Sequence, residues 1–195
     1  TQSFCREYLR PNFFTNTPDI LPEILQKGGR PAFRSRFVLA ATLSSVYGIY
    51  NGYELCENAA IPGKEEYLHS EKYEYKVWDW DRPGNIKEDI RKLNRFRRQN
   101  PALQQLWNLR FCPAHEDNVL FYAKWAGDNL VFCAVNLDPF AAHEAWLEFP
   151  HDLVPERFRL EECFTGAVEE RQGRHHHIRL DPHENPAAVW RVMPL

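Results

Sequence analysis

The feature that most constrains the fold is a change of pattern near Pro101. Before it, apolar residues follow strand-like and helix-like spacings in turn. After it, short apolar or alternating runs are separated by Gly, Pro and Asn, which is typical of strands joined by turns. The chain has 195 residues, 44% of them hydrophobic, which is enough for one large or two small domains with a real core. The change of pattern therefore predicts a mixed α/β region followed by an all-β region.

The first region contains two predicted strands, each followed by a helical pattern. Phe13–Thr15 is predicted to be a short strand that ends at Asn16, and Val46–Gly52 is predicted to be a buried strand that ends at Asn51-Gly52. Between them we expect a short helix over Ile20–Gln26, closed by Gly28-Gly29, and a second helix over Pro31–Leu43, with proline in its first turn.

A further amphipathic helix is predicted after residue 85. Its apolar positions recur at helical spacing, and its charged positions fall on the opposite face, with Glu88 and Lys92 spaced for an ion pair. We expect the arginines near its end, Arg95, Arg97 and Arg98, to lie on a solvated face rather than to bind phosphate. The stretch Tyr53–Pro83 has no clean period, and long loops of this kind are often functional.

The second region is predicted to be an antiparallel β-sandwich. Two apolar runs, Val119–Trp125 and Leu130–Leu137, flank "AGDN", a good hairpin signal. Further strands are predicted over Ala145–Phe149, His176–Leu180 and Ala187–Val192. The order strand, helix, strand, helix before an all-β unit is typical of the end of an α/β barrel with an appended β domain. The first region is too short to hold eight strand–helix units by itself.

Composition argues against several classes of protein. The formal net charge is −3 and the pI is about 6.2, whereas a general nucleic-acid binder is usually strongly basic. No apolar run reaches the ~18 residues of a spanning helix, and there is no signal-peptide pattern. The opening "TQSFCREYL" has no methionine, so a fragment or a processed piece is expected.

The cysteines predict no zinc ribbon and no disulfide framework. Their number, five, is odd, their spacing is wide and no C-x-x-C occurs. We expect reduced, buried thiols in a cytosolic protein.

Asp19 is the first candidate for chemistry, and two interpretations are open. Thr17 could cap a helix, with Pro18 at the first helical position and Asp19 favoured in the first turn by the helix dipole. Alternatively, a carboxylate just after a barrel strand lies on the face where barrel active sites are built. The residues alone favour capping.

Three other places carry weaker signals. Glu54 follows the second predicted strand, so it could reach the same face as Asp19, or it could be an exposed loop acid. The loop 65–85 combines aromatic and charged residues, a pattern that fits sugar binding as well as packing over a core. His175 and His177 would share one face of a strand, but the sequence names no further ligands, and no metal site is predicted.

At this point the residues resemble a known family. The stretch 16–86, which includes "NTPDILPE", "GIYNGYE" and "SEKYE", is similar to the late catalytic-domain region of the α-1,4-glucan:maltose-1-phosphate maltosyltransferases of the α-amylase superfamily. The similarity continues through "NLDP" and "FTG" to the C-terminus and so covers essentially the whole chain. Most α-amylase relatives have His-Asp where this chain has Pro18-Asp19, and the Thr-Pro-Asp spelling favours the maltosyltransferase branch.

The resemblance implies a fold. It makes residues 1–106 the last strand–helix units of a catalytic (β/α)8 barrel, and residues 107–195 a C-terminal antiparallel β domain. The family is similar to other retaining glycoside-processing enzymes, in which one carboxylate is the nucleophile and a second carboxyl group is the acid/base. In the family those two groups come from earlier barrel strands, so the 195-residue chain alone is expected to be inactive.

The resemblance also implies site residues and partners. Asp19 would stabilise the transition state by holding the donor sugar more tightly as its ring becomes oxocarbenium-like. Lys72 and Tyr73 match positions that contact the maltosyl donor. The expected partners are maltose 1-phosphate and α-1,4-glucan, without cofactor, metal, nucleic acid or membrane, in a cytoplasmic protein that is a homodimer at full length.

Two alternatives remain at this stage. A hydrolase or isomerase of the same superfamily would process glucan without phosphate, although Pro18 before Asp19 weighs against it. A carbohydrate-binding or assembly module without catalysis is suggested by the β half and the loop aromatics.

Overall fold

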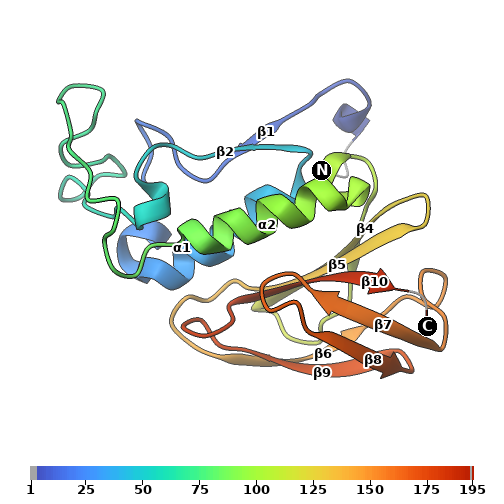
Figure 1. Ribbon diagram of the computed structural model, residues 1–195. Coiled ribbons are helices and arrows are strands. Elements are labelled where there is room, and N and C mark those ends of the chain that lie inside the picture. Colours follow the sequence, from blue (N-terminus) through green and yellow to red (C-terminus); the bar gives the residue numbers. More distant parts are fainter. Residues whose placement is uncertain (1–3, 194) are drawn as a thin grey trace.

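Two short parallel strands organise the first half of the chain, as the computed structural model shows for residues 4–193 and 195 (Figure 1). β1 (Asn12–Phe14) pairs with β2 (Val46–Gly48), with Phe13 opposite Tyr47. A short 3-10 helix, η1 (Phe4–Glu7), precedes β1. The predicted strand–helix–strand order is confirmed, but β2 is shorter than expected. It ends at Gly48 because the next residues turn toward the short 3-10 helix η2 (Tyr53–Leu55).

The helix between these strands, α1 (Glu23–Leu43), is bent at Gly29. Gly29 has φ 53° and ψ −153°, which a helix does not allow, so α1 consists of two helical segments as the Gly-Gly pair predicted. The expected start at Ile20 is wrong. Thr17 and Ile20 instead exchange two backbone hydrogen bonds across a tight turn, and Pro22 lies immediately before the first helical residue.

The helix α2 (Lys87–Gln99) has the predicted apolar face, but two of its charged residues behave differently from the expectation. Glu88 pairs with Arg91 rather than with Lys92, whose ammonium donates to the carbonyl of Phe164 at 2.6 Å. Arg97 is half-buried and donates to Ser45 at 2.9 Å and to other carbonyls just after α1, so it is not part of a solvated face.

The second half is a set of antiparallel strands, as predicted. After the 3-10 helix η3 (Pro101–Gln104), one six-stranded sheet has the order β3-β4-β5-β10-β7-β8, and a two-stranded ribbon pairs β6 with β9. The bounds are β3 (Leu109–Cys112), β4 (Val119–Ala126), β5 (Asn129–Asn136), β6 (His143–Glu148), β7 (Arg157–Glu162), β8 (Val168–Gln172), β9 (His175–Leu180) and β10 (Ala187–Met193). The hairpin at "AGDN" is confirmed by the pairing of Ala126 with Asn129.

Three of these strands, β3, β7 and β8, were not predicted as separate elements. β8 in particular has the sequence "VEERQ" and no buried residue, so it carries no apolar alternation that a reader of the sequence could detect. It is a strand because its neighbour β7 supplies hydrogen bonds along its length.

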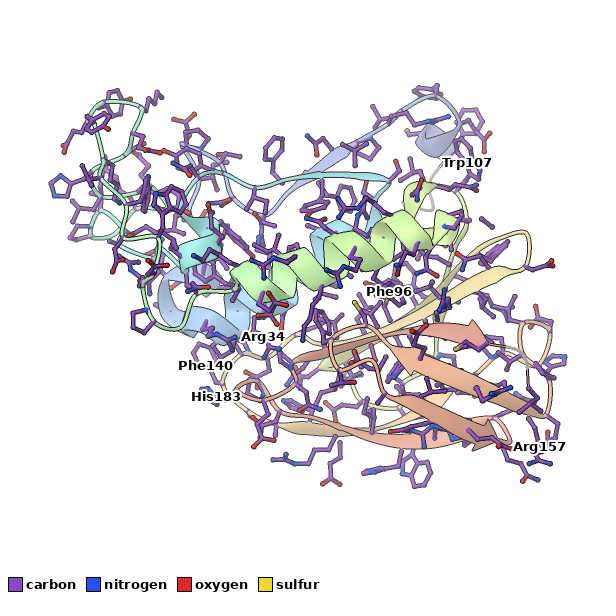
Figure 2. The ribbon with its side chains drawn as sticks, viewed as in Figure 1. Arg34, Phe96, Trp107, Phe140, Arg157 and His183 are labelled. Carbon is purple, nitrogen blue, oxygen red and sulfur yellow. The ribbon has the colours of Figure 1, made fainter. Side chains whose placement is uncertain are left out.

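One apolar core joins the two halves. The six-stranded sheet packs one face against α1, so that Phe37 and Val38 belong to the same buried cluster as Tyr122 and Val131. The other face packs against the β6–β9 ribbon, where the rings of Phe121, Phe132 and Phe149 meet. Figure 2 shows Phe96 of α2 at the junction between the helices and the strands.

The cysteines are all unpaired, as expected, but they are not all buried. Cys133 is buried, Cys5 is exposed, and the other three are half-buried. Within the described residues, no helix combines the length and apolar character that crossing a membrane requires.

Candidate functional site

The ends of β1 and β2 are tied together by Asn16. Its side-chain oxygen accepts a hydrogen bond from the backbone of Tyr50 at 2.9 Å, and its amide donates to the hydroxyl of Tyr67. Asn16 and Tyr67 are both buried. Because the two strands are parallel, this contact holds the residues that follow each of them on one side of the pair.

Asp19 lies at the tip of the turn Thr17–Ile20, directly after this junction. The Thr17 hydroxyl accepts a hydrogen bond from the Asp19 backbone at 3.3 Å, so it stabilises the turn rather than a helix. The capping interpretation of Asp19 is therefore wrong, since α1 begins four residues later. The first amide of α1, at Glu23, instead donates to the carboxylate of Glu65 at 2.9 Å.

Lys72 and Tyr73 are brought to Asp19 by the loop 65–85. The Ser70 hydroxyl donates to the carbonyl of Pro18 at 3.3 Å, and this contact positions the turn that follows it. The Lys72 ammonium then donates to Asp19 Oδ1 at 2.6 Å and lies 5.2 Å from the centre of the Tyr73 ring. We call Asp19, Lys72 and Tyr73 the Asp19 cluster.

The Asp19 cluster is open to solvent. The side chain of Asp19 is 64% exposed, and Tyr73 is 77% exposed. The hydrogen bond to Asp19 raises the pKa of Lys72, so Lys72 carries its charge at neutral pH. An exposed ion pair of this kind adds little to stability. It leaves a carboxylate and an aromatic ring free to meet a ligand.

A small hollow adjoins Asp19 and Tyr73. Its volume is about 230 Å³, and it is also lined by Pro18, Tyr67, Ser70 and Glu74. Small-molecule sites usually measure ~300–1,000 Å³ and are mostly apolar. The hollow is therefore about the size of part of a binding site.

Two carboxylates fix the loop behind the cluster. Glu71 accepts hydrogen bonds from Asn51 at 3.0 Å and from the Trp78 indole at 2.9 Å, and the Asn51 contact is the main cause that lowers the pKa of Glu71. Buried Glu57 accepts from Arg82 at 3.2 Å and lies 3.6 Å from the Lys76 ammonium. Both contacts connect the loop to residues just after β2.

Glu54, the second candidate from the sequence, is part of η2 and is half-buried. It lines a separate shallow hollow with Asn51, Trp80 and Lys87, which shares no lining residue with the hollow at Asp19. The loop aromatics are divided between two roles, because Tyr67 is buried in the core whereas Tyr73 and Tyr75 point into solvent.

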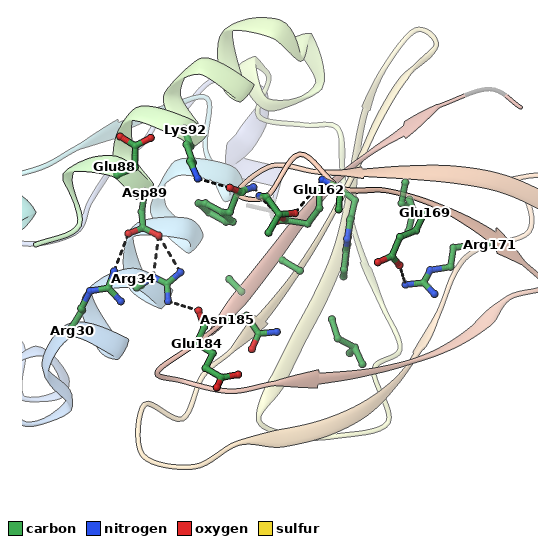
Figure 3. Close-up of a pocket in the computed structure, with 18 residues that line it drawn as sticks. Arg30, Arg34, Glu88, Asp89, Lys92, Glu162, Glu169, Arg171, Glu184 and Asn185 are labelled. Atoms are coloured by element: carbon green, nitrogen blue, oxygen red, sulfur yellow. Dashed lines mark hydrogen bonds and ion pairs between the residues drawn. The ribbon is translucent and has the colours of Figure 1, made fainter. Parts of the chain in front are cut away.

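A larger cleft separates the helices from the strands (Figure 3). Its volume is about 650 Å³. Asp89 of α2 pairs with Arg34 of α1 at 3.0 Å and with Arg30 at 3.3 Å, while the Arg34 guanidinium also donates to the carbonyl of Glu184 at 2.9 Å. These charges bind one another across the junction, so we interpret the cleft as a structural contact between the two halves.

The histidine run lies on β9, far from the Asp19 cluster in the fold. His177 pairs with Glu144 at 3.3 Å, and His176 packs its ring against Phe149 and Phe158. Over the described part of the chain, no group of three or more His, Cys, Asp or Glu side chains is arranged to hold a metal ion.

Sequence reasoning identified Asp19, Lys72 and Tyr73 but missed the residues that place them. Asn16 was recognised only as a strand end, and Ser70 was not singled out. Neither has a local signal beyond being a small polar residue in a loop, since the partner of each is more than thirty residues away.

Comparison with known proteins gives a consistent family. Residues 111–192 match the family model described as GLGE, C-terminal. Over 96% of its length the chain is 55% identical to a Rhodospirillum rubrum protein named α-1,4-glucan:maltose-1-phosphate maltosyltransferase, of which it covers 28%. A Myxococcus xanthus protein of the same name is 50% identical over 98% of the chain, which covers 30% of that relative. The chain thus spans less than a third of the length of these relatives.

Solved structures show the same fold at low sequence identity. The α-amylase of Geobacillus thermoleovorans in complex with acarbose superposes on 94% of the chain with a TM-score of 0.68 and 14% identity, and the chain covers 39% of it. The γ-cyclodextrin glucanotransferase of Bacillus clarkii superposes on 91% of the chain with a TM-score of 0.62 and 18% identity, and the chain covers 25% of it.

Proposed function

Because this chain belongs, as a C-terminal portion, to the α-1,4-glucan:maltose-1-phosphate maltosyltransferase family, we propose that its parent protein transfers maltosyl units from maltose 1-phosphate to the non-reducing end of an α-1,4-glucan. The observation that carries this proposal within the chain is the Asp19 cluster. It joins a carboxylate after β1 to a lysine and a tyrosine 53 and 54 residues later, beside the ends of two parallel strands.

In this proposal, residues 1–106 are the last strand–helix units of a catalytic barrel and residues 107–195 are its C-terminal β domain. Support comes from the parallel β1–β2 pair, from the helices that follow each strand, and from the likeness to α-amylase structures. Active sites of such barrels lie at the carboxyl ends of the strands. Asp19 follows the carboxyl end of β1, so it would lie on that face.

Asp19 acts in the proposal as a transition-state stabiliser. Its exposed carboxylate accepts hydrogen bonds from the donor-sugar hydroxyls, and these bonds strengthen as positive charge develops on the sugar ring. Lys72 orients the carboxylate from one side, and the exposed ring of Tyr73 offers an apolar face to the maltosyl unit. The nucleophile and the acid/base would come from the remainder of the parent, so the 195-residue chain alone is inactive.

The proposal also covers the setting of the parent. It is cytoplasmic, which agrees with five unpaired cysteines, and it is a homodimer. Neither property changes the role given to Asp19.

The test is a phosphate-release assay on the full-length parent with maltose 1-phosphate and a malto-oligosaccharide acceptor. Asp19→Asn is expected to lower kcat by ~10²–10³-fold, as removal of a transition-state hydrogen-bonding group does elsewhere. Lys72→Met and Tyr73→Ala are expected to raise the KM for maltose 1-phosphate by ~10-fold, equivalent to about 1.4 kcal/mol of binding.

Asp152→Asn is the matched control. Asp152 is also an exposed aspartate paired with one cation, Arg110 at 2.7 Å, but it lies in the β-rich half. Its turnover should equal that of the unmodified parent. If the parent releases no phosphate the proposed reaction is wrong, and if Asp19→Asn keeps near-normal turnover Asp19 has no part in it.

A further inference from the structure

The outer face of the β6–β9 ribbon carries an exposed aromatic pair that the proposed reaction does not use. Cross-strand pairing sets Glu144 opposite Arg179, Trp146 opposite His177, and Glu148 opposite His175. Side chains alternate along a strand, so these six share one face, while Ala145, Leu147 and Leu180 are buried on the other. We call these six residues the Trp146 face.

Trp146 is the largest apolar group on this face, and 54% of it is exposed. Its ring lies 5.3 Å from that of His177, centre to centre, with the two planes inclined at 60°. The His177 ring is held from its other end, because its Nε2 lies 3.3 Å from Glu144 Oε2. The two rings therefore form a fixed, angled surface rather than two independent side chains.

The charges around this surface neutralise one another. Glu148 pairs with Arg174 at 2.5 Å and lies 3.9 Å from His175, while Arg179 pairs with Asp181 at 2.9 Å. A surface with paired charges gives no general attraction to a polyanion such as nucleic acid or to an anionic membrane. It favours an uncharged ligand that can exchange hydrogen bonds with carboxylates and guanidinium groups.

We infer that the Trp146 face is a surface site for an α-1,4-glucan chain. The apolar C–H face of one glucose unit stacks on the Trp146 indole, and the next unit contacts His177, while Glu144 and Arg179 exchange hydrogen bonds with the sugar hydroxyls. An α-1,4 linkage turns each sugar face relative to the last, which fits rings inclined at 60°. A flat β-1,4-linked chain would instead require coplanar rings.

The choice of α-1,4-glucan rests on the proposed function, but the site itself does not depend on catalysis. β6 and β9 lie on the side of the β-rich half that faces away from α1 and α2 (Figure 1). A glucan bound there leaves the helical half, with the Asp19 cluster, unobstructed. The site would hold a long acceptor near the enzyme while its free end reacts elsewhere.

The experiment is a titration of the 195-residue chain with maltoheptaose, followed by tryptophan fluorescence and by NMR. Binding is expected with a Kd of ~1 mM or tighter. Trp146→Ala should weaken it by at least ~10-fold and His177→Ala by a few-fold, while cellohexaose should bind at least ~10-fold more weakly than maltoheptaose.

Trp107→Ala is the control, because Trp107 is 48% exposed but lies before β3, outside the Trp146 face. Its affinity should be unchanged, and thermal unfolding should show that Trp146→Ala remains folded. Equal binding of cellohexaose, or full binding by Trp146→Ala, would overturn the inference. So would a shift from dimer to monomer in sedimentation of Trp146→Ala without loss of sugar binding, since the face would then be a subunit contact.

The same titration separates this inference from the proposed function. The full-length parent carrying Asp19→Asn should bind maltoheptaose through Trp146 with unchanged affinity. Binding lost with Trp146→Ala in a parent that releases no phosphate would refute only the proposed reaction.

Discussion

The parallel pair β1–β2 and the six-stranded antiparallel sheet both contain apolar residues, but they bury them to different extents. No residue of β1 or β2 is fully buried, and Phe14 remains 49% exposed. In the six-stranded sheet, β4 and β5 bury most of their side chains, because α1 covers one face and the β6–β9 ribbon covers the other. Parallel sheets are normally covered on both faces.

This difference teaches how each candidate site is built. The Trp146 face is carried by a ribbon whose inner side is part of a finished core, so its geometry depends only on residues of this chain. The Asp19 cluster depends on a sheet of two short strands and on a loop held by a few polar contacts. The proposal that the parent supplies further barrel strands would complete the second site but leave the first unchanged.

The largest expected effect comes from one residue type placed in both regions. Phe132→Ala removes a fully buried ring that stacks on Phe121, and it should lower the free energy of unfolding by about 3–5 kcal/mol. Phe14→Ala should cost less than ~1 kcal/mol, because Phe14 is half exposed. Urea unfolding of both variants measures the difference, and similar costs would break the comparison.

The next effect tests how the loop is held at the end of β2. Gly52 has φ +89°, and a Cβ there would lie 2.3 Å from the Trp78 ring. Gly52→Ala should therefore cost about 3 kcal/mol, from backbone strain and from displacement of Trp78. Gly63→Ala is the control, since Gly63 also has positive φ, +75°, but nothing lies near its Cβ position.

Gly63→Ala should cost only ~1 kcal/mol, the strain alone. Proteolysis of the loop 65–85 should accelerate in Gly52→Ala and not in Gly63→Ala. Equal proteolysis rates would show that Trp78 does not anchor the loop.

A somewhat smaller effect concerns the carbonyls that follow α1. Arg97→Ala removes the hydrogen bonds to Ser45 and Leu103, and leaves partly buried carbonyls without that donor, so we expect a loss of about 2 kcal/mol of stability. Arg98→Ala, on the exposed side of α2, should change stability by less than ~0.5 kcal/mol. Thermal unfolding of the pair would contradict the corrected role of Arg97 if both changes were alike.

The smallest effect sharpens the view of the finished core, where Lys124 is fully buried and donates to the carbonyl of Gln105 at 2.6 Å. Burial lowers the pKa of Lys124 to about 8, so between pH 8 and its ordinary value the unfolded chain binds more protons than the folded one. Stability from this group therefore rises with pH, by about 1 kcal/mol between pH 7 and 8.5.

Lys124→Met is the reference for this measurement. Burial raises the pKa of several thiols, including Cys133 to about 12, and their titration in the unfolded chain opposes the lysine above pH 8. Those thiols are present in both proteins, so the difference between the two urea-unfolding curves isolates Lys124. A difference that stays constant from pH 7 to 8.5 would show that the buried amine does not titrate there.

Much of the fold could be predicted from local patterns. The Gly28-Gly29 break in α1, the hairpin at "AGDN" and the apolar face of α2 are each carried by neighbouring residues, and all three are confirmed. The start of α1 was misjudged because Thr17 and Pro18 are equally good at starting a helix or a tight turn. The resemblance to a family was visible in the sequence because its motifs are contiguous.

The sequence by itself thus determined the order of elements, the family and the identity of Asp19, Lys72 and Tyr73. Only the tertiary structure decided that Lys72 meets Asp19, that Arg97 binds the end of α1, and that Trp146 and His177 stand together on an exposed face. The physical reason is that these contacts join side chains tens of residues apart. Their partners are set by strand register and loop closure, which no local pattern of apolar and polar residues specifies.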